Sequence, residues 1–162
     1  MKKCGGFIML EAEKELLISQ QSSNLWTRRR RELAAWIERP KPITAGKALC
    51  DFNGVYVDAA IYPALMALQE ASIPTEFSCA GVSILDEADD HSLYAYVTML
   101  DGPVTEYFVQ YAMERMGNRL LVTYEPGRGR YDVSSFYIGH NRSFCYLLAA
   151  VARNFKQTSY YK

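Results

Sequence analysis

The chain has 162 residues, of which 49% are hydrophobic and 13% aromatic, and its 18 basic side chains balance 18 acidic ones. This length suits one domain with a sizeable core, and a formal net charge of zero provides no overall attraction to a polyanion. Its cysteines (Cys4, Cys50, Cys79 and Cys145) form no C-x-x-C pair, which argues against a zinc ribbon. No apolar run suits a signal peptide or a bilayer span. We therefore expect a cytoplasmic protein with reduced thiols and no membrane contact.

The N-terminal region is predicted to be helical. Residues 9–20 have the pattern of a short helix, and Asn24 is a candidate cap for a second helix over residues 25–38. Apolar residues form a stripe along this second helix, and a run of arginines covers the opposite side. Prolines follow it, so we expect a surface linker over residues 40–50.

Helix and strand patterns alternate along the rest of the chain. We expect helices from Asp58 (as cap) to Ser72, from Pro103 to Gly117, and from Asn141 or Ser143 onward, with strands over residues 75–79, 92–99, 119–124 and 133–138. This order predicts an α/β protein of the α+β type, with a mixed or antiparallel sheet of about four or more strands covered by helices. Residues 1–24 are expected to be a helical extension, and residues 25–162 a single domain.

The loop Ser78-Cys79-Ala80-Gly81 is the first candidate functional site. Small residues after a strand expose backbone amides and allow a ligand to come close to the chain. Ser78 adds a hydroxyl, and Cys79 adds a thiol that becomes a nucleophile if its pKa is lowered. The alternative is a buried structural cysteine beside a tight turn, since free cysteine is among the most buried residue types.

Two arginine-rich segments are candidates for binding RNA or nucleotide phosphate, because guanidinium groups pair with phosphate in a two-pronged geometry. A solvated helix face is the alternative for the first segment, and an ordinary hairpin turn for the second, which is neither a dinucleotide fingerprint nor a P-loop. The histidines, His91 and His140, have no supporting carboxylate spacing, so we expect no metal. The candidate arginines are Arg28, Arg29, Arg30, Arg31, Arg128 and Arg130.

Several motifs occur in a characteristic order. They are Trp26-Thr27-Arg28-Arg29, Asp51-Phe52-Asn53-Gly54, Thr75-Glu76-Phe77-Ser78-Cys79-Ala80-Gly81, Leu121-Val122-Thr123-Tyr124-Glu125-Pro126, and a final helix with the aromatic-basic end Phe155-Lys156. In this order they resemble the wybutosine-synthesis tRNA methyltransferase family, over about residues 25–159. The resemblance implies an enzyme that methylates tRNA, or another nucleotide-type substrate, with S-adenosylmethionine as cofactor.

Site residues follow from this resemblance. Cys79, Glu125 and Asp51 are the expected catalytic residues. Loop residues 78–81 and His140 are expected to hold the ligand, and the arginines to contact RNA phosphates. The expected stacking residues for a base or adenine ring are Tyr96, Tyr124 and Tyr137.

A second hypothesis comes from departures from the family. The chain has Val82 where the family has an arginine, and Thr123 where it has a lysine. Because these changes remove polar groups that would hold a substrate, the alternative is a non-catalytic protein that sequesters or senses a nucleotide-derived ligand on the same scaffold. Both hypotheses require the loop and the tyrosine-bearing strands to share one cavity. Tyr160 and Tyr161 add aromatic surface that a second copy could cover in a homo-oligomer.

Overall fold

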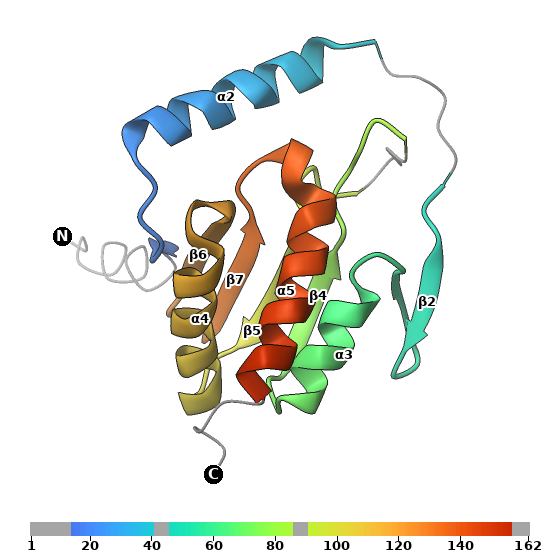
Figure 1. The fold of residues 1–162 in the computed structure, drawn as a ribbon, viewed down its shortest axis with the longest axis vertical. Coiled ribbons are helices and arrows are strands. Elements are labelled where there is room, and N and C mark those ends of the chain that lie inside the picture. The colour runs from blue at the N-terminus through green and yellow to red at the C-terminus, as the bar shows by residue number, and fades with distance from the viewer. Residues whose placement is uncertain (1–13, 41–45, 86–90, 157–162) are drawn as a thin grey trace, which may run out of the picture.

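The protein is a two-layer α/β structure with its helices on one face of the sheet (Figure 1). The computed structural model describes residues 14–40, 46–85 and 91–156. An antiparallel sheet contains, in spatial order, β1 (Leu16–Leu17), β6 (Leu120–Glu125), β7 (Arg130–Ser135), β5 (Tyr96–Leu100) and β4 (Thr75–Cys79). The covering helices are α3 (Tyr62–Glu70), α4 (Pro103–Met116) and α5 (Asn141–Lys156). The predicted fold class is therefore confirmed, with antiparallel pairing throughout this sheet.

The strand register separates apolar from polar side chains. Val122, Val133 and Val97 are direct partners across β6, β7 and β5, and all belong to the buried core under the helices. Asp132 and Thr98 are partners one residue away along the same strands. Since side chains alternate between the faces of a strand, this pair lies on the far face, which the helices do not cover.

The helices bury their apolar faces on the sheet. Phe108 of α4, Leu65 of α3 and Leu148 of α5 are among the most buried side chains. Pro103 begins α4, since its fixed φ suits the first helical turn, and Gly117 follows the last residue of α4 with a φ of 56°. No helix in the described part of the chain is both long and apolar enough to cross a membrane.

A hairpin of β2 (Leu49–Phe52) and β3 (Val55–Asp58) forms a second, two-stranded sheet. Its turn residues Asn53 and Gly54 have positive φ values of 52° and 84°, as a two-residue hairpin favours. The sequence indicated this turn, but the prediction of a linker over residues 40–50 missed the start of β2. Strand β3 contacts β4, so the hairpin lies beside the edge of the main sheet.

The helix α2 (Ser23–Glu38) crosses above one end of the sheet (Figure 1). Its N-cap is Ser22 rather than the predicted Asn24. No residue of α2 is buried, so the core does not hold it. Instead, the Glu32 carboxylate accepts hydrogen bonds from the backbone amides of Ile138 (2.6 Å) and Gly139 (3.0 Å). Polar contacts therefore attach α2 to the loop after β7.

The prediction of a helix over residues 9–20 is wrong where the structure describes it. Leu16 and Leu17 form β1 and pair with Tyr124 and Thr123 of β6. These residues satisfy hydrogen-bonding groups along the edge of the sheet, which a surface helix would leave unpaired. Residues 1–13 lie outside the described part of the chain, as do Tyr160 and Tyr161.

Two strands are displaced from their predicted positions. β5 begins at Tyr96 rather than at residue 92, and β7 covers Arg130–Ser135 rather than residues 133–138. β7 lies between β6 and β5, and its first residue, Arg130, is paired with Glu125 of β6 and with Leu100 of β5. Pairing on both sides therefore extends β7 toward the turn that precedes it. Long-range pairing thus overrides the local pattern at these boundaries.

Candidate functional site

The loop that follows β4 passes against the first turn of α5. Gly81 in this loop has a φ of +73°, and a Cβ on it would lie 2.3 Å from Nδ2 of Asn141 and 2.5 Å from the backbone nitrogen of Ala95. Both distances are far inside van der Waals contact, so only glycine fits here. The close approach that the sequence predicts for a ligand is therefore made, at Gly81, by the protein's own Asn141.

Asn141 links the loop to the start of β5. Its Oδ1 accepts a hydrogen bond from the amide of Ala95 (2.9 Å), and its Nδ2 donates to the carbonyl oxygens of Val82 and Leu93, both at 2.8 Å. The Asn141 side chain is buried, so it provides the hydrogen bonds that water would otherwise make to these three backbone groups. The loop is thus held in one position relative to α5.

A pocket of about 460 Å³ lies beside this loop, between the start of α3 and α5. Ala59, Ala60, Ala80, Gly81 and Ala149 are among its lining residues, and their small side chains leave flat apolar surfaces. Cys145 also lines it, and burial raises the pKa of this thiol to about 12, which keeps it neutral. The pocket therefore has an apolar interior.

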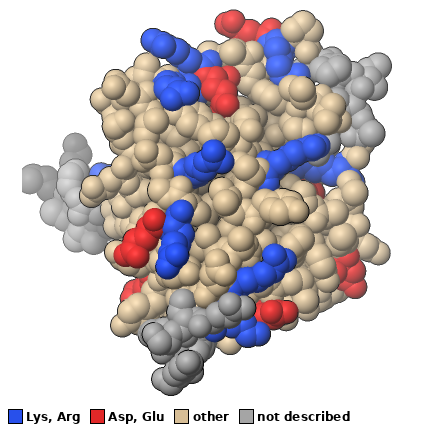
Figure 2. All heavy atoms as spheres, viewed as in Figure 1, with Lys and Arg blue, Asp and Glu red and all other residues tan. Residues whose placement is uncertain are grey.

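One side of the pocket is charged and aromatic. Arg142, Tyr146 and Arg153 of α5 line it, and Tyr146 is 85% exposed. Neither arginine forms an ion pair with a carboxylate within residues 14–40, 46–85 and 91–156. Figure 2 shows basic side chains across the middle of this face of the molecule, with acidic ones mostly toward its margins.

A polar cluster, formed by Lys47, Asp58, Cys79 and His91, lies next to the same loop. Its members come from four segments, because Lys47 precedes β2, Asp58 ends β3, Cys79 ends β4 and His91 precedes β5. Lys47 Nζ lies 3.1 Å from Asp58 Oδ2 and 3.7 Å from Cys79 Sγ. His91 Nδ1 lies 3.7 Å from Cys79 Sγ and 3.9 Å from Asp58 Oδ2.

Asp58 is charged at the centre of this cluster. Burial by itself would raise the pKa of its carboxyl, but a hydrogen bond from the Ala80 amide (2.7 Å) and the Lys47 ammonium outweigh that effect and hold the pKa below its usual value. The prediction that Asp58 caps the following helix is wrong. Ile61 is the N-cap of α3, without a side-chain bond, because the Asp58 carboxylate is already bound to Ala80 and Lys47.

The far face of the sheet has a second hollow, of about 480 Å³. Arg29, Tyr94, Tyr96 and Asp132 are among its lining residues. Burial raises the pKa of Asp132, although a hydrogen bond from Thr98 opposes the shift. Burial, and then the neighbouring Cys79, Asp132 and Asp58, also raise the pKa of Tyr96. This hollow therefore favours the neutral forms of Asp132 and Tyr96.

The predicted catalytic residues do not lie together. Cys79 belongs to the polar cluster, whereas Asp51 accepts the Gly54 amide (2.8 Å) within the hairpin turn. Glu125 forms an ion pair with Arg128 (3.6 Å). In the sheet, Cys79 is paired with Tyr96 at the start of β5. Glu125 is paired with Arg130, which is itself paired with Leu100 at the end of β5. Cys79 and Glu125 therefore lie toward opposite ends of this strand.

The predicted ligand-binding residues are also divided. Ala80 and Gly81 line the loop pocket, whereas Ser78 pairs with Val97 on the helix-covered face. None of the three predicted stacking tyrosines is among the lining residues of this pocket, and Tyr96 lines the far-face hollow instead.

Tyr124 and Tyr137 have structural contacts of their own. The Tyr124 hydroxyl donates to Asp101 (2.7 Å), a bond that raises its pKa to about 12. Tyr137 contacts His140 edge-on, with ring centroids 5.3 Å apart, below α2. Burial lowers the pKa of His140. None of these three residues is among the lining residues of the loop pocket.

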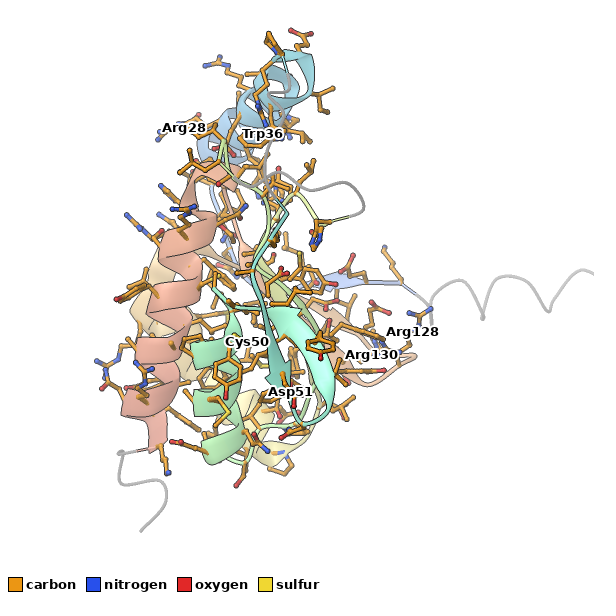
Figure 3. All side chains as sticks on the ribbon, turned by 90° about the vertical axis from the view of Figure 1, so that its right-hand side faces the viewer. Arg28, Trp36, Cys50, Asp51, Arg128 and Arg130 are labelled. Carbon is orange, nitrogen blue, oxygen red and sulfur yellow. The ribbon has the colours of Figure 1, made fainter. Side chains whose placement is uncertain are left out.

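The candidate arginines occupy separate regions, as Figure 3 shows for Arg28 at the top and for Arg128 and Arg130 on the side. Arg29 is only partly exposed, and its guanidinium donates to the carbonyl oxygens of Ser135 and Phe136 and lies 3.8 Å from the Tyr94 ring centroid. Arg130 pairs with Glu76 (3.3 Å). Arg28, Arg30 and Arg31 are exposed, so only these three remain available on α2 for phosphate.

Several residues at these sites were missed by the sequence analysis. Arg142, Tyr146, Ala149 and Arg153 follow the i, i+4, i+7, i+11 spacing of one helix face, a signal that was present in the sequence. No comparable local signal exists for the polar cluster, because its residues come from four separate segments.

Comparisons of the chain with protein-family models, with curated proteins and with solved structures found no match. The resemblance to wybutosine-synthesis tRNA methyltransferases therefore stays a prediction.

Proposed function

We propose that the protein binds a nucleotide-type small molecule, a planar ring system attached to an anionic group, in the pocket between the loop after β4 and α5. The observation that supports this function is the combination of a small-residue apolar wall with Arg142, Tyr146 and Arg153 along one side of the same pocket. This function keeps the nucleotide-type ligand of the non-catalytic alternative, but not the cavity shared with the tyrosine-bearing strands, because Tyr146 of α5 lines the pocket and the three predicted stacking tyrosines do not.

The dimensions of the pocket support a ligand of this size. Its volume of about 460 Å³ lies within the range of about 300–1,000 Å³ that is usual for small-molecule sites. Ala59, Ala80 and Ala149 have no side chain beyond Cβ, so a flat ring can lie against them. Tyr146, which is 85% exposed, offers an aromatic face at the rim on which a ring can stack.

The charges of the pocket support an anionic ligand. Guanidinium groups bind phosphate or carboxylate through paired hydrogen bonds, and α5 carries two of them on the face that lines the pocket. Arg142 lies in the first turn of α5, whose backbone amides add a partial positive charge. An anion at this end of the pocket would therefore meet Arg142 and the positive end of the helix dipole. Arg153 lies 11 residues further along α5, roughly 16 Å at about 1.5 Å per residue, and adds positive charge at the other end of the same face.

A binding experiment tests the proposal directly. The full chain is titrated by calorimetry, and its melting temperature measured, with AMP, cyclic AMP and S-adenosylmethionine as probes, because a ligand that binds only the folded state raises the melting temperature. We expect at least one probe to bind, and the double variant Arg142→Gln/Arg153→Gln to weaken that binding about tenfold or more. Arg115→Gln is the matched control, since Arg115 is exposed on α4 and does not line the pocket.

The same samples distinguish binding from methyl transfer. If no probe binds, or if the double variant binds as tightly as Arg115→Gln, the proposal is wrong. Labelled methyl transfer from S-adenosylmethionine to unmodified tRNA, lost in Cys79→Ala and in Glu125→Ala, would instead support the methyltransferase hypothesis. Binding without such transfer supports a protein that sequesters or senses its ligand.

A further inference from the structure

The polar cluster brings three different metal-binding side chains toward one point. Asp58 Oδ2, Cys79 Sγ and His91 Nδ1 all lie within 4.8 Å of one another. Two of these separations are 3.7 Å (Cys79 to His91) and 3.9 Å (His91 to Asp58). In a tetrahedral zinc site, bond lengths of about 2.3 Å to sulfur and about 2.1 Å to nitrogen or oxygen place the ligand atoms roughly 3.4–3.6 Å apart. These two separations thus differ from those of a zinc site by only a few tenths of an ångström, and the third, between Asp58 Oδ2 and Cys79 Sγ, is below 4.8 Å.

The arrangement differs from that of a cysteine–histidine–carboxylate triad. In a triad the nucleophile and the carboxylate contact different nitrogens of the imidazole ring. Here Cys79 Sγ and Asp58 Oδ2 both approach Nδ1 of His91. Convergence on one nitrogen is expected for ligands around a common ion, and not for a chain of proton transfers.

The chemistry of the ligands selects the ion. Thiolate and imidazole favour zinc, whereas magnesium and calcium prefer oxygen ligands alone. Two backbone amides hold ligand atoms of the cluster in place, from Ala80 to Asp58 Oδ2 (2.7 Å) and from Gly81 to Cys79 Sγ (3.4 Å). Such outer hydrogen bonds orient ligands in known metal sites.

Lys47 already supplies a positive charge to the same atoms. Its side chain is 4% exposed, and its ammonium contacts both Asp58 Oδ2 and Cys79 Sγ. An ammonium and a divalent ion repel one another at this range, so they cannot share the site. The flexible four-carbon stem of lysine allows the ammonium to leave, and the partly exposed His91 provides a route from solvent.

We propose that Asp58, Cys79 and His91 bind one Zn²⁺ ion, and that Lys47 is the counter-cation which the ion displaces. Three protein ligands leave a fourth position for water or for an external ligand. None of these four residues lines the loop pocket, so this proposal does not depend on nucleotide binding there.

The test uses the full chain, reduced and stripped of metal with a chelator. Zn²⁺ affinity is measured by competition with a chromophoric chelator, and Co²⁺ is used as a spectroscopic probe of the ligands. We expect one ion per chain and a cobalt–thiolate charge-transfer band. Cys79→Ser removes the band, and His91→Gln weakens Zn²⁺ binding roughly tenfold or more. The matched controls Cys50→Ser and His140→Gln should leave both measurements unchanged.

Lys47 provides the sharpest test. Lys47→Gln removes the repulsion and is expected to tighten Zn²⁺ binding about tenfold, whereas Lys156→Gln, on the end of α5, has no effect. Absence of a cobalt–thiolate band in the wild-type chain overturns the site, as does equal affinity in the Cys79→Ser/His91→Gln double variant. Unchanged or weaker Zn²⁺ binding in Lys47→Gln overturns the displacement. The wild-type spectrum decides the question even if a variant fails to fold.

Discussion

Asn141 shows how a single side chain connects the loop after β4 to the core. It contributes one acceptor and two donor bonds to three backbone groups on two segments, Val82 and residues 93–95. The sequence indicated Asn141 only as a possible start of the last helix. It could not indicate these partners, because hydrogen bonds between distant segments leave no periodic pattern in the chain.

We predict that Asn141→Ala lowers the free energy of unfolding by about 3 kcal/mol, because the backbone groups it binds are left buried without partners. Asn154→Ala on the exposed side of the same helix is the control, and should change stability by less than about 0.5 kcal/mol. Urea denaturation of both variants measures the difference. Equal stability of the two variants would contradict the role given to Asn141.

At the scale of elements, α2 was predicted correctly as a helix, but its contacts were not. Its basic run suggested a surface for phosphate, yet Arg29 points toward the loop after β7 and binds the carbonyl oxygens of Ser135 and Phe136. Four consecutive residues cover a full turn of a helix, so at least one of four consecutive arginines must point toward the protein rather than toward solvent. Which one faces the protein depends on how the helix is docked.

We predict that Arg29→Ala weakens the docking of α2 by about 1–2 kcal/mol, since it removes hydrogen bonds to backbone carbonyls and a cation–π contact with Tyr94. Hydrogen exchange should become faster across α2 while the β5–β7 amides stay protected. Arg30→Ala is the control, because Arg30 is exposed and its guanidinium donates a hydrogen bond to the Thr27 hydroxyl within the same helix. Equal exchange in the two variants would rule out this role.

At the scale of the whole molecule, stability depends on pH through groups that folding removes from water. Burial, and then the Arg119 guanidinium, lower the pKa of His140 below the value of about 6.5 that an unfolded chain has. Its Nδ1 is buried and has no hydrogen-bond partner among the described residues. As pH falls below about 6.5, the unfolded chain therefore binds a proton that the folded chain resists, and stability decreases.

We predict that His140→Gln reduces the loss of stability between pH 7 and lower values, because glutamine has no proton to take up in this range. Denaturation curves at several pH values for the wild type and for the variant measure the effect. His91 is present in both proteins, so its contribution cancels in the comparison. A wild-type chain that becomes more stable on acidification relative to the variant would show that the sign is wrong.

The sequence alone determined most of the local structure of this protein. Alternating and helical hydrophobic patterns identified α4, α5, β4 and β6 near their observed positions, because each pattern records which face of one element is buried. A mixed or antiparallel sheet covered by helices followed from the order of these elements, and the structure shows that the pairing is antiparallel. The short edge strand β1 and the hairpin strands β2 and β3 were not identified, because their pairing partners rather than their own periodicity define them.

Only the tertiary structure decided which side chains meet. Lys47, Asp58, Cys79 and His91 lie in four segments, and they converge because β3 lies beside β4 and β4 pairs with β5. The same packing separates Cys79 from Asp51 and Glu125, which the sequence had grouped. The physical reason is that a periodic pattern reports the environment of its own element, while the relative placement of elements depends on burial and pairing over the whole chain.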